Sequence, residues 1–103
     1  MGEIIRNGWE NKEFISLRTR EYDSLKKTVL QTKYTPGEVS FLTGVSEEDL
    51  LRAAEWIGTA DRCTVLYAMG LSHLSGGISN VRAIANLMML TGNIGRPGTG
   101  VNA

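Results

Sequence analysis

The chain has very little cysteine: Cys63 is the only one among 103 residues. A single thiol excludes a disulfide within the chain, and it excludes a zinc or iron–sulfur site built from the chain's own cysteines. Lys and Arg together number eleven, as do Asp and Glu, so the formal net charge is zero. This balance leaves no global positive field that would recruit nucleic acid or an anionic membrane.

Long hydrophobic runs are also missing. No apolar stretch approaches the roughly 18 residues of a membrane-spanning helix, and the amino-terminal sequence lacks the apolar core of a signal peptide. We therefore expect a cytoplasmic, reducing location. Hydrophobic residues make up 42% of the chain and charged residues 21%, which is typical of a globular protein and not of a disordered one.

The charges are unevenly spread along the chain. Residues 1–60 carry eighteen charged side chains, whereas residues 61–103 carry four. The second segment also holds seven of the twelve glycines. We interpret residues 1–60 as a helical segment and residues 61–103 as a segment of strand, helix and glycine-rich loops. Together they are expected to form one partial domain of a larger protein.

Residues 1–60 contain four short stretches in which apolar side chains recur at helical spacing. Asn11 is a candidate N-cap for the first stretch, KEFISLRT, and the second runs from Glu21 to Gln31. The third follows Thr35 as its cap, has a proline at its first position and ends at Gly44. These signals predict three short helices.

The fourth helix has the most complete set of signals. Ser46 and Asp49 form a capping box, and Glu48 can pair with Arg52 one turn later. Trp56 is expected to pack on the inward face of this helix. Nothing in the four stretches indicates chemistry, so we assign them to structural packing.

The pattern changes after residue 62. Cys63–Met69 is β-branched and apolar on both faces, which predicts a strand buried in a parallel sheet. A glycine-rich turn follows over residues 70–77, and residues 78–90 have the spacing of a long helix. The predicted fold class is therefore an α/β fragment, mainly helical, with four short helices, one buried strand, a glycine-rich turn and a long C-terminal helix. The strand, turn and helix would make half of a βαβ unit.

Three features of the second segment are candidates for chemistry, and each has a structural alternative. The Gly70–Gly77 turn could present backbone N–H groups to a polar ligand, but glycine equally permits a tight turn, and the spacing matches neither GxGxxG nor a P-loop. His73 has no Cys, Asp or Glu near it in the sequence, which is typical of a hydrogen-bonding loop residue. Cys63 is expected to be a buried, inert thiol.

The second segment resembles a known family. The run YAMGLSHLSGGISNVRAIANLMMLTGNIGRPGTGVN resembles the catalytic subunits of molybdopterin-dependent formate dehydrogenases, which belong to the molybdopterin oxidoreductases that include dimethyl sulfoxide reductases. Its most specific part is LTGNIGRPGTGVN. The stretches NGWENKEFISLRT and KYTPGEVSFLTGVSEEDLLRAAEWIGTA are similar to the same subunits. The resemblance covers most of the chain and implies an internal fragment of such a subunit.

The resemblance implies oxidation of formate to carbon dioxide, or the reverse, at molybdenum or tungsten held by two molybdopterin guanine dinucleotides. It implies that eight residues line this cofactor: Met69, Gly70, Ser72, His73, Gly95, Gly98, Gly100 and Asn102. The family's metal-ligating cysteine or selenocysteine, its iron–sulfur cysteines and its formate-orienting arginine have no counterpart here. No catalytic or metal-ligating residue is therefore assigned, and the chain alone is expected to be inactive and to hold no cofactor. The implied partner is the remainder of the catalytic subunit.

Two other classes stay open: a helical protein-interaction module and a small nucleotide-binding mini-domain that uses the Gly70–Gly77 turn. The module predicts oligomers or a bound partner, and the mini-domain predicts affinity for a guanine nucleotide. A lone strand has unpaired backbone groups on both edges, so we expect self-association through Cys63–Met69. The glycine-rich loop over residues 92–103 is expected to need anchoring by a ligand or by further chain.

Overall fold

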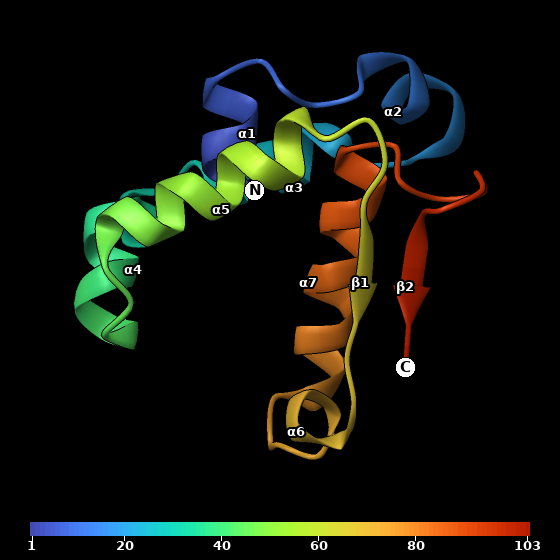
Figure 1. Cartoon of the computed structure of the whole chain (residues 1–103). Helices are drawn as coiled ribbons and strands as arrows, with labels where there is room; N and C mark the ends of the chain where they lie inside the picture. The colour runs from blue at the N-terminus through green and yellow to red at the C-terminus, as the bar shows by residue number, and fades with distance from the viewer.

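The computed structural model describes residues 1–103, and its elements form two arms that meet near the amino-terminal helices (Figure 1). One arm holds α4 and α5, and the other holds α6, α7 and the two strands. In chain order the elements are α1 (Gly2–Arg6), α2 (Lys12–Arg18), α3 (Tyr22–Val29), a 3-10 turn η1 (Thr32–Tyr34), α4 (Pro36–Thr43), α5 (Glu47–Thr59), β1 (Thr64–Leu66), α6 (Met69–Ser72), α7 (Gly77–Leu90) and β2 (Gly100–Asn102). The mainly helical α/β class is confirmed.

The four helices expected in residues 1–60 are present as α2 to α5. Asn11 Oδ1 accepts a hydrogen bond of 2.9 Å from the Phe14 N–H, and Ser46 Oγ accepts one of 3.2 Å from the Asp49 N–H. Both bonds satisfy N–H groups that have no partner inside their helix. Gly44 ends α4 with a φ of 77°, in the left-handed region that favours glycine. Local capping signals therefore locate these helices correctly.

Two expectations for these helices are wrong. The Thr35 hydroxyl does not cap α4; it donates instead to the Thr32 carbonyl oxygen at 2.8 Å, which the η1 turn brings within reach. Trp56 is 68% exposed, because Ala54 and Ile57 are the α5 side chains that pack against the core. The additional helix α1 was not predicted, since it is five residues long and has no side-chain cap.

The sheet contains two parallel strands, where the sequence predicted one. Thr64 of β1 pairs with Gly100 of β2, and Leu66 pairs with Asn102. Because α6 and α7 connect the two strands, residues 61–103 make a minimal βαβ unit and not half of one. Three residues that include glycine carry almost no strand signal in the sequence, which is why β2 was missed.

The predicted strand Cys63–Met69 is also shorter and less buried than expected. β1 has three residues, and Leu66 is 78% exposed. The helix α7 runs alongside the sheet (Figure 1), whereas a buried parallel strand needs cover on both faces. The expectation of a buried strand is therefore wrong for this chain.

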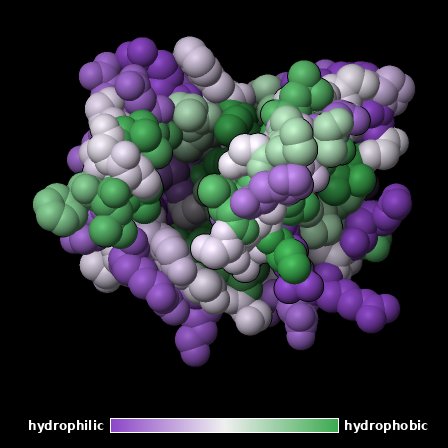
Figure 2. All heavy atoms as spheres, turned by 90° about the horizontal axis from the view of Figure 1, so that it is seen from below, coloured by the Kyte–Doolittle hydropathy of each residue, from purple (hydrophilic) through white to green (hydrophobic).

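The hydrophobic core lies where the two arms meet. Ile4, Ile15 and Leu90 form its buried cluster and join α1, α2 and α7. Ten of the 103 residues are buried, while Phe41 is 86% exposed. Figure 2 shows apolar side chains on both sides of a hollow between the arms, and a cavity of about 460 Å³ there is lined by residues of α1, α3, α4 and α7. Exposed apolar surface of this extent is typical of a face that meets other protein.

None of the helices combines the length and the apolar character that crossing a lipid bilayer requires.

Candidate functional site

The residues that follow β1 form the first part of the candidate site. Met69–Ser72 is one helical turn, α6, where the sequence predicted a glycine-rich turn. The His73 N–H closes this turn by donating to the Met69 carbonyl oxygen at 2.8 Å. Met69 is 66% exposed and His73 is exposed. A Cβ placed on Gly70 would meet no atom within 4 Å, so the outer side of α6 is open to a ligand.

Packing alone explains why residue 77 is a glycine. A Cβ on Gly77 would lie 1.9 Å from the carbonyl oxygen of Ser72, so no side chain fits between α6 and α7. The Asn80 Nδ2 group supports the same junction by donating to the Leu71 carbonyl oxygen at 3.2 Å. The close approach of α6 to α7 therefore requires glycine at this position, independently of any ligand.

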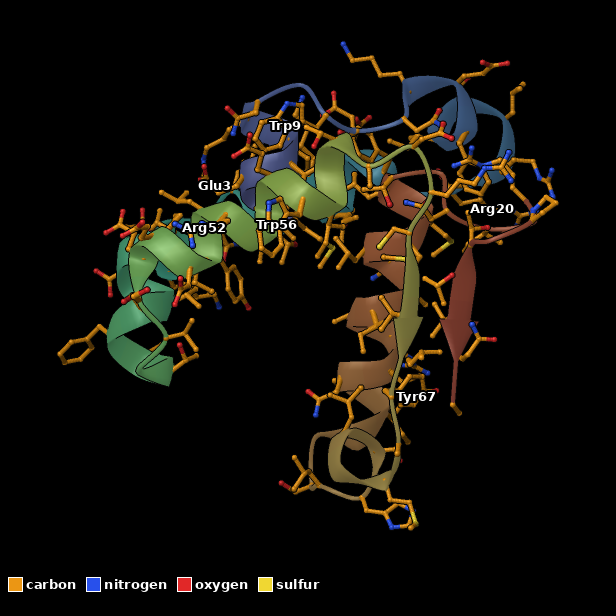
Figure 3. The ribbon with its side chains drawn as sticks, viewed as in Figure 1. Glu3, Trp9, Arg20, Arg52, Trp56 and Tyr67 are labelled. Atoms are coloured by element: carbon orange, nitrogen blue, oxygen red, sulfur yellow. The ribbon has the colours of Figure 1, made fainter.

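Asn102 lies beside the residues that follow β1. The Tyr67 N–H donates to the Asn102 carbonyl oxygen at 2.9 Å, which extends the parallel ladder beyond Leu66. Figure 3 shows Tyr67 just past the end of β1, between α6 and β2. Asn102 and the α6 region therefore share the carboxyl edge of the sheet. In open α/β sheets this edge is where ligands bind.

Three predicted site residues lie toward the opposite, amino edge of the sheet. Gly100 pairs with Thr64 at the start of β1, and the Thr64 hydroxyl donates to the Gly98 carbonyl oxygen at 3.0 Å. Gly95, Gly98 and Gly100 have φ values of 77°, 79° and 127°, which L side chains rarely adopt. The eight predicted residues thus form two groups: Met69, Gly70, Ser72, His73 and Asn102 at one edge, and Gly95, Gly98 and Gly100 toward the other.

Asn93 anchors the glycine-rich loop from within the chain. Its side chain is fully buried, and its Oδ1 accepts hydrogen bonds from the Cys63 N–H at 2.9 Å and from Arg96 Nη2 at 3.3 Å. Its Nδ2 donates to the Thr91 hydroxyl at 2.8 Å. These bonds tie the start of the loop to the rest of the chain, a connection that the sequence did not predict. Sequence reasoning missed Asn93, for which the only signal was a polar residue directly after an apolar helix and its Gly92 terminus.

Arg96 ties the same loop to the segment before β1. Its Nη2 donates to the Asp61 carbonyl oxygen at 2.9 Å, and its Nε donates to the Gly92 carbonyl oxygen at 3.3 Å. The fixed fork of a guanidinium suits this role, because it reaches several acceptors at once. Asn93 and Arg96 together determine where β2 begins beside β1.

The groups at the carboxyl edge are suited to binding a ligand. It offers backbone groups, the hydroxyl of Ser72, the imidazole of His73 and the amide of Asn102, with no carboxylate among them. The chain has no group of three or more His, Cys, Asp or Glu side chains that could hold a metal ion. Cys63 is a free thiol that is half-buried, so the expectation of a buried thiol is wrong. This set can orient a polar ligand, but it supplies no ligand set for a metal.

No protein-family model matches the chain. Among curated proteins, the chain is similar to the F420-dependent formate dehydrogenase 1 subunit alpha of Methanococcus maripaludis, with 44% identity over 102 residues, which is 99% of this chain and 15% of that subunit. The F420-dependent formate dehydrogenase subunit alpha of Methanocaldococcus jannaschii is 41% identical over 99 residues, 96% of this chain and 14% of the relative. Formate dehydrogenase H of Escherichia coli is 36% identical over 99 residues, which is 96% of this chain and 14% of the relative.

The chain therefore spans about one seventh of the length of these relatives. The identity extends over both the helical segment and the βαβ unit, so it does not depend on the glycine-rich loop alone. The chain is homologous to a segment of the alpha subunits of formate dehydrogenases.

Proposed function

We propose that the chain acts as a segment of a formate dehydrogenase catalytic subunit and contributes part of its cofactor pocket. The intact subunit would oxidise formate to carbon dioxide, or run the reverse reaction. The observation that carries this proposal is the identity of 36–44% with three formate dehydrogenase subunits over 96–99% of the chain. Random similarity does not extend through two structurally different segments at this level.

The carboxyl edge of the sheet is the part of the chain that we assign to the cofactor. The backbone at Gly70 can be approached closely, because nothing in the chain occupies the space beside it. The Ser72 hydroxyl, the His73 imidazole and the Asn102 amide can exchange hydrogen bonds with a polar ring system or a phosphate. These groups fit a pterin nucleotide better than an apolar ligand.

The cofactor expected here is a bis-molybdopterin guanine dinucleotide with molybdenum or tungsten, which supplies the two-electron redox chemistry when bound. The chain's own residues would bind and orient the organic part of it. Gly95, Gly98 and Gly100 would contribute through the backbone path that carries β2 to the carboxyl edge. None of these residues moves a proton or bonds to formate in this proposal.

The remainder of the subunit is the partner that the proposal requires. One half-buried thiol and no metal-binding group of three residues leave the metal ligand to other parts of that subunit. Phe41, Trp56 and Leu66 are 86%, 68% and 78% exposed, and they would be covered when those parts pack against this segment. The chain alone is therefore expected to lack formate-dependent activity.

A chimera tests this proposal. The matching segment of formate dehydrogenase H is replaced by residues 1–102 of this chain, and formate-dependent dye reduction is measured. We expect activity within about tenfold of the parent enzyme, and a loss of at least tenfold more when Asn102→Ala and His73→Ala are added. A matched control is Asn7→Ala, which lies far from the edge and should have no effect. A chimera that folds and is inactive would contradict the proposal.

A further inference from the structure

Glu10 carries a carboxylate that is buried and incompletely paired. Its side chain is 8% exposed, and its Oε1 lies 3.9 Å from Nζ of Lys12, whose own side chain is 82% exposed. Its Oε2 is buried and accepts no hydrogen bond. Burial of a carboxylate oxygen without a donor is costly. The other oxygen, Oε1, also accepts no hydrogen bond and is the accessible one, so the free energy of the site improves when a ligand donates to Oε1.

The Glu10 side chain lines a cavity of about 460 Å³ beside α2 and α3. The other lining residues are Lys12, Ile15, Ser16, Thr19, Tyr22, Asp23 and Lys26. Three hydroxyls and a second carboxylate can accept hydrogen bonds in this cavity, whereas Ile15 and the Tyr22 ring offer an apolar wall. This combination suits a group that donates several hydrogen bonds at one end and is apolar along its stem.

Glu10 carries the one buried charge among the residues that line the cavity. Burial raises the pKa of the Tyr22 phenol, and the negative charges of Glu10 and Asp23 raise it further. Lys12, Asp23 and Lys26 are all exposed, so water screens their charges more strongly than the charge of the buried Glu10. The inner part of the cavity thus favours positive charge, and its single buried carboxylate matches a charge of one.

We propose that this cavity binds an organic cation with several N–H donors, a guanidinium or alkylammonium group of the kind that arginine and lysine side chains carry. An N–H of the cation donates to Glu10 Oε1, and the alkyl stem lies against Ile15. Such charge-assisted hydrogen bonds are stronger than neutral ones. A divalent metal is disfavoured, because the chain has no group of three metal-binding side chains.

The cavity is separate from the edge assigned to the cofactor. The neighbouring Asn11 N–H donates to the Leu90 carbonyl oxygen at 2.8 Å, which places Glu10 at the last turn of α7. The α6 turn lies at the other end of this helix (Figure 1). The proposal for the Glu10 cavity therefore stands independently of the proposed enzyme function.

The experiment titrates the chain with N-acetylarginine methylamide and follows backbone amide shifts by NMR. We expect saturable shifts at Glu10, Ser16 and Tyr22, with a dissociation constant on the order of a few millimolar. The neutral isostere N-acetylcitrulline methylamide should bind at least tenfold more weakly. Glu10→Gln should weaken binding of the arginine probe at least tenfold, and Glu13→Gln, a change of an exposed carboxylate in the first turn of α2, should leave it unchanged.

A third probe distinguishes the source of the cation. Agmatine is a freely diffusing guanidinium with no peptide groups. An affinity more than tenfold above that of the blocked arginine indicates a small molecule as the natural ligand, and comparable affinities indicate a side chain of a neighbouring protein segment. Both results support the cavity as a cation site.

Equal binding of the arginine and citrulline probes would overturn the proposal, as would unchanged binding in the Glu10→Gln variant. If Glu10→Gln prevents folding, the pKa of the Tyr22 phenol in the unaltered chain is measured with each probe instead. The arginine probe places a positive charge beside Glu10 and should lower the pKa of Tyr22. The neutral citrulline probe should leave this pKa unchanged. An unchanged Tyr22 titration would then overturn the proposal.

Discussion

The Asn93 side-chain oxygen accepts a hydrogen bond of 2.9 Å from the Cys63 N–H, which lies thirty residues earlier in the chain. This bond joins the end of the βαβ crossover to the residue that precedes β1. Because Arg96 donates to the same oxygen and to Asp61, the loop is fixed at the point where β2 must start. The parallel pairing of β1 and β2 depends on this connection.

The first prediction concerns the buried amide. Asn93→Ala should lower the free energy of unfolding by about 2 kcal/mol, because the partly buried Cys63 N–H loses its partner. Chemical denaturation measures this change. Asn7→Ala removes an exposed amide that donates to the Glu3 carbonyl oxygen and should cost well below about 1 kcal/mol. Equal losses in the two variants would contradict the role assigned to Asn93.

The second prediction compares two adjacent glycines. Gly77→Ala places a Cβ 1.9 Å from the Ser72 carbonyl oxygen, so the α6–α7 junction must shift, at a cost of about 2 kcal/mol or more. Gly76→Ala meets no atom within 4 Å and should change stability by less than about 0.5 kcal/mol. Thermal unfolding of both variants tests this contrast. A Gly77→Ala variant as stable as the original chain would show that α6 does not approach α7 this closely.

The third prediction concerns the contact between Trp9 and α5. A Cβ on Gly58 would lie 2.9 Å from Trp9 Cε3 and 3.3 Å from Ile4 Cγ1, and Figure 3 shows Trp9 above α5. Gly58→Ala should therefore destabilise the chain, although alanine is favoured in helices by up to about 1 kcal/mol. Gly37→Ala, whose nearest contact is 3.9 Å away, should stabilise α4 by up to that amount. Stabilisation by Gly58→Ala in denaturation experiments would contradict the packing described.

The fourth prediction concerns the titration of Tyr22. Burial raises the pKa of its phenol above 10.0, with further contributions from Glu10 and Asp23. A raised pKa in the folded chain means that the folded state keeps the proton when the unfolded state has lost it. Stability should therefore fall as the pH rises above about 10. Tyrosinate absorbance titration, with Tyr22→Phe to identify the signal, measures the pKa, and a Tyr22 pKa below 10.0 would contradict the described burial.

The fifth prediction concerns self-association. β1 and β2 pair with each other, so each keeps one strand edge without a partner in the chain, and Leu66 is 78% exposed. Edges of this kind recruit further strands. The isolated chain should therefore form dimers or larger species at high concentration, and Leu66→Lys should reduce them. Light scattering that finds only monomers of the unaltered chain at high concentration would contradict this prediction.

The sequence predicted features that depend on neighbouring residues and missed contacts between residues far apart in the chain. Asn11, Ser46 and Gly44 act within a few residues of the helix ends that they cap, so their roles can be read from neighbouring residues. The pairing of Gly100 with Thr64 and the bond from Cys63 to Asn93 join positions about thirty residues apart or more. No short-range pattern carries that information, and β2 and its anchor were therefore missed.

In the candidate site, too, the grouping of residues close in the sequence could be predicted, and the grouping of distant residues could not. Gly70, Ser72 and His73 are close in the sequence, and the structure keeps them together on α6 and its C-cap. Asn102 reaches the same edge only through the parallel pairing of the strands. Family resemblance supplied the list of eight residues, but it did not show that Gly95, Gly98 and Gly100 lie away from the α6 group.

Gly70→Val in the chimeric subunit tests the central claim most directly. In the isolated chain a Cβ at Gly70 meets no atom within 4 Å, and residue 70 is exposed, so the substitution should leave stability nearly unchanged. The proposed cofactor approaches this position in the intact subunit, so the molybdenum or tungsten content of the purified chimera should fall at least tenfold. Gly76→Val, which also projects into open space, should leave the content unchanged. Full metal content in the Gly70→Val chimera would contradict the account.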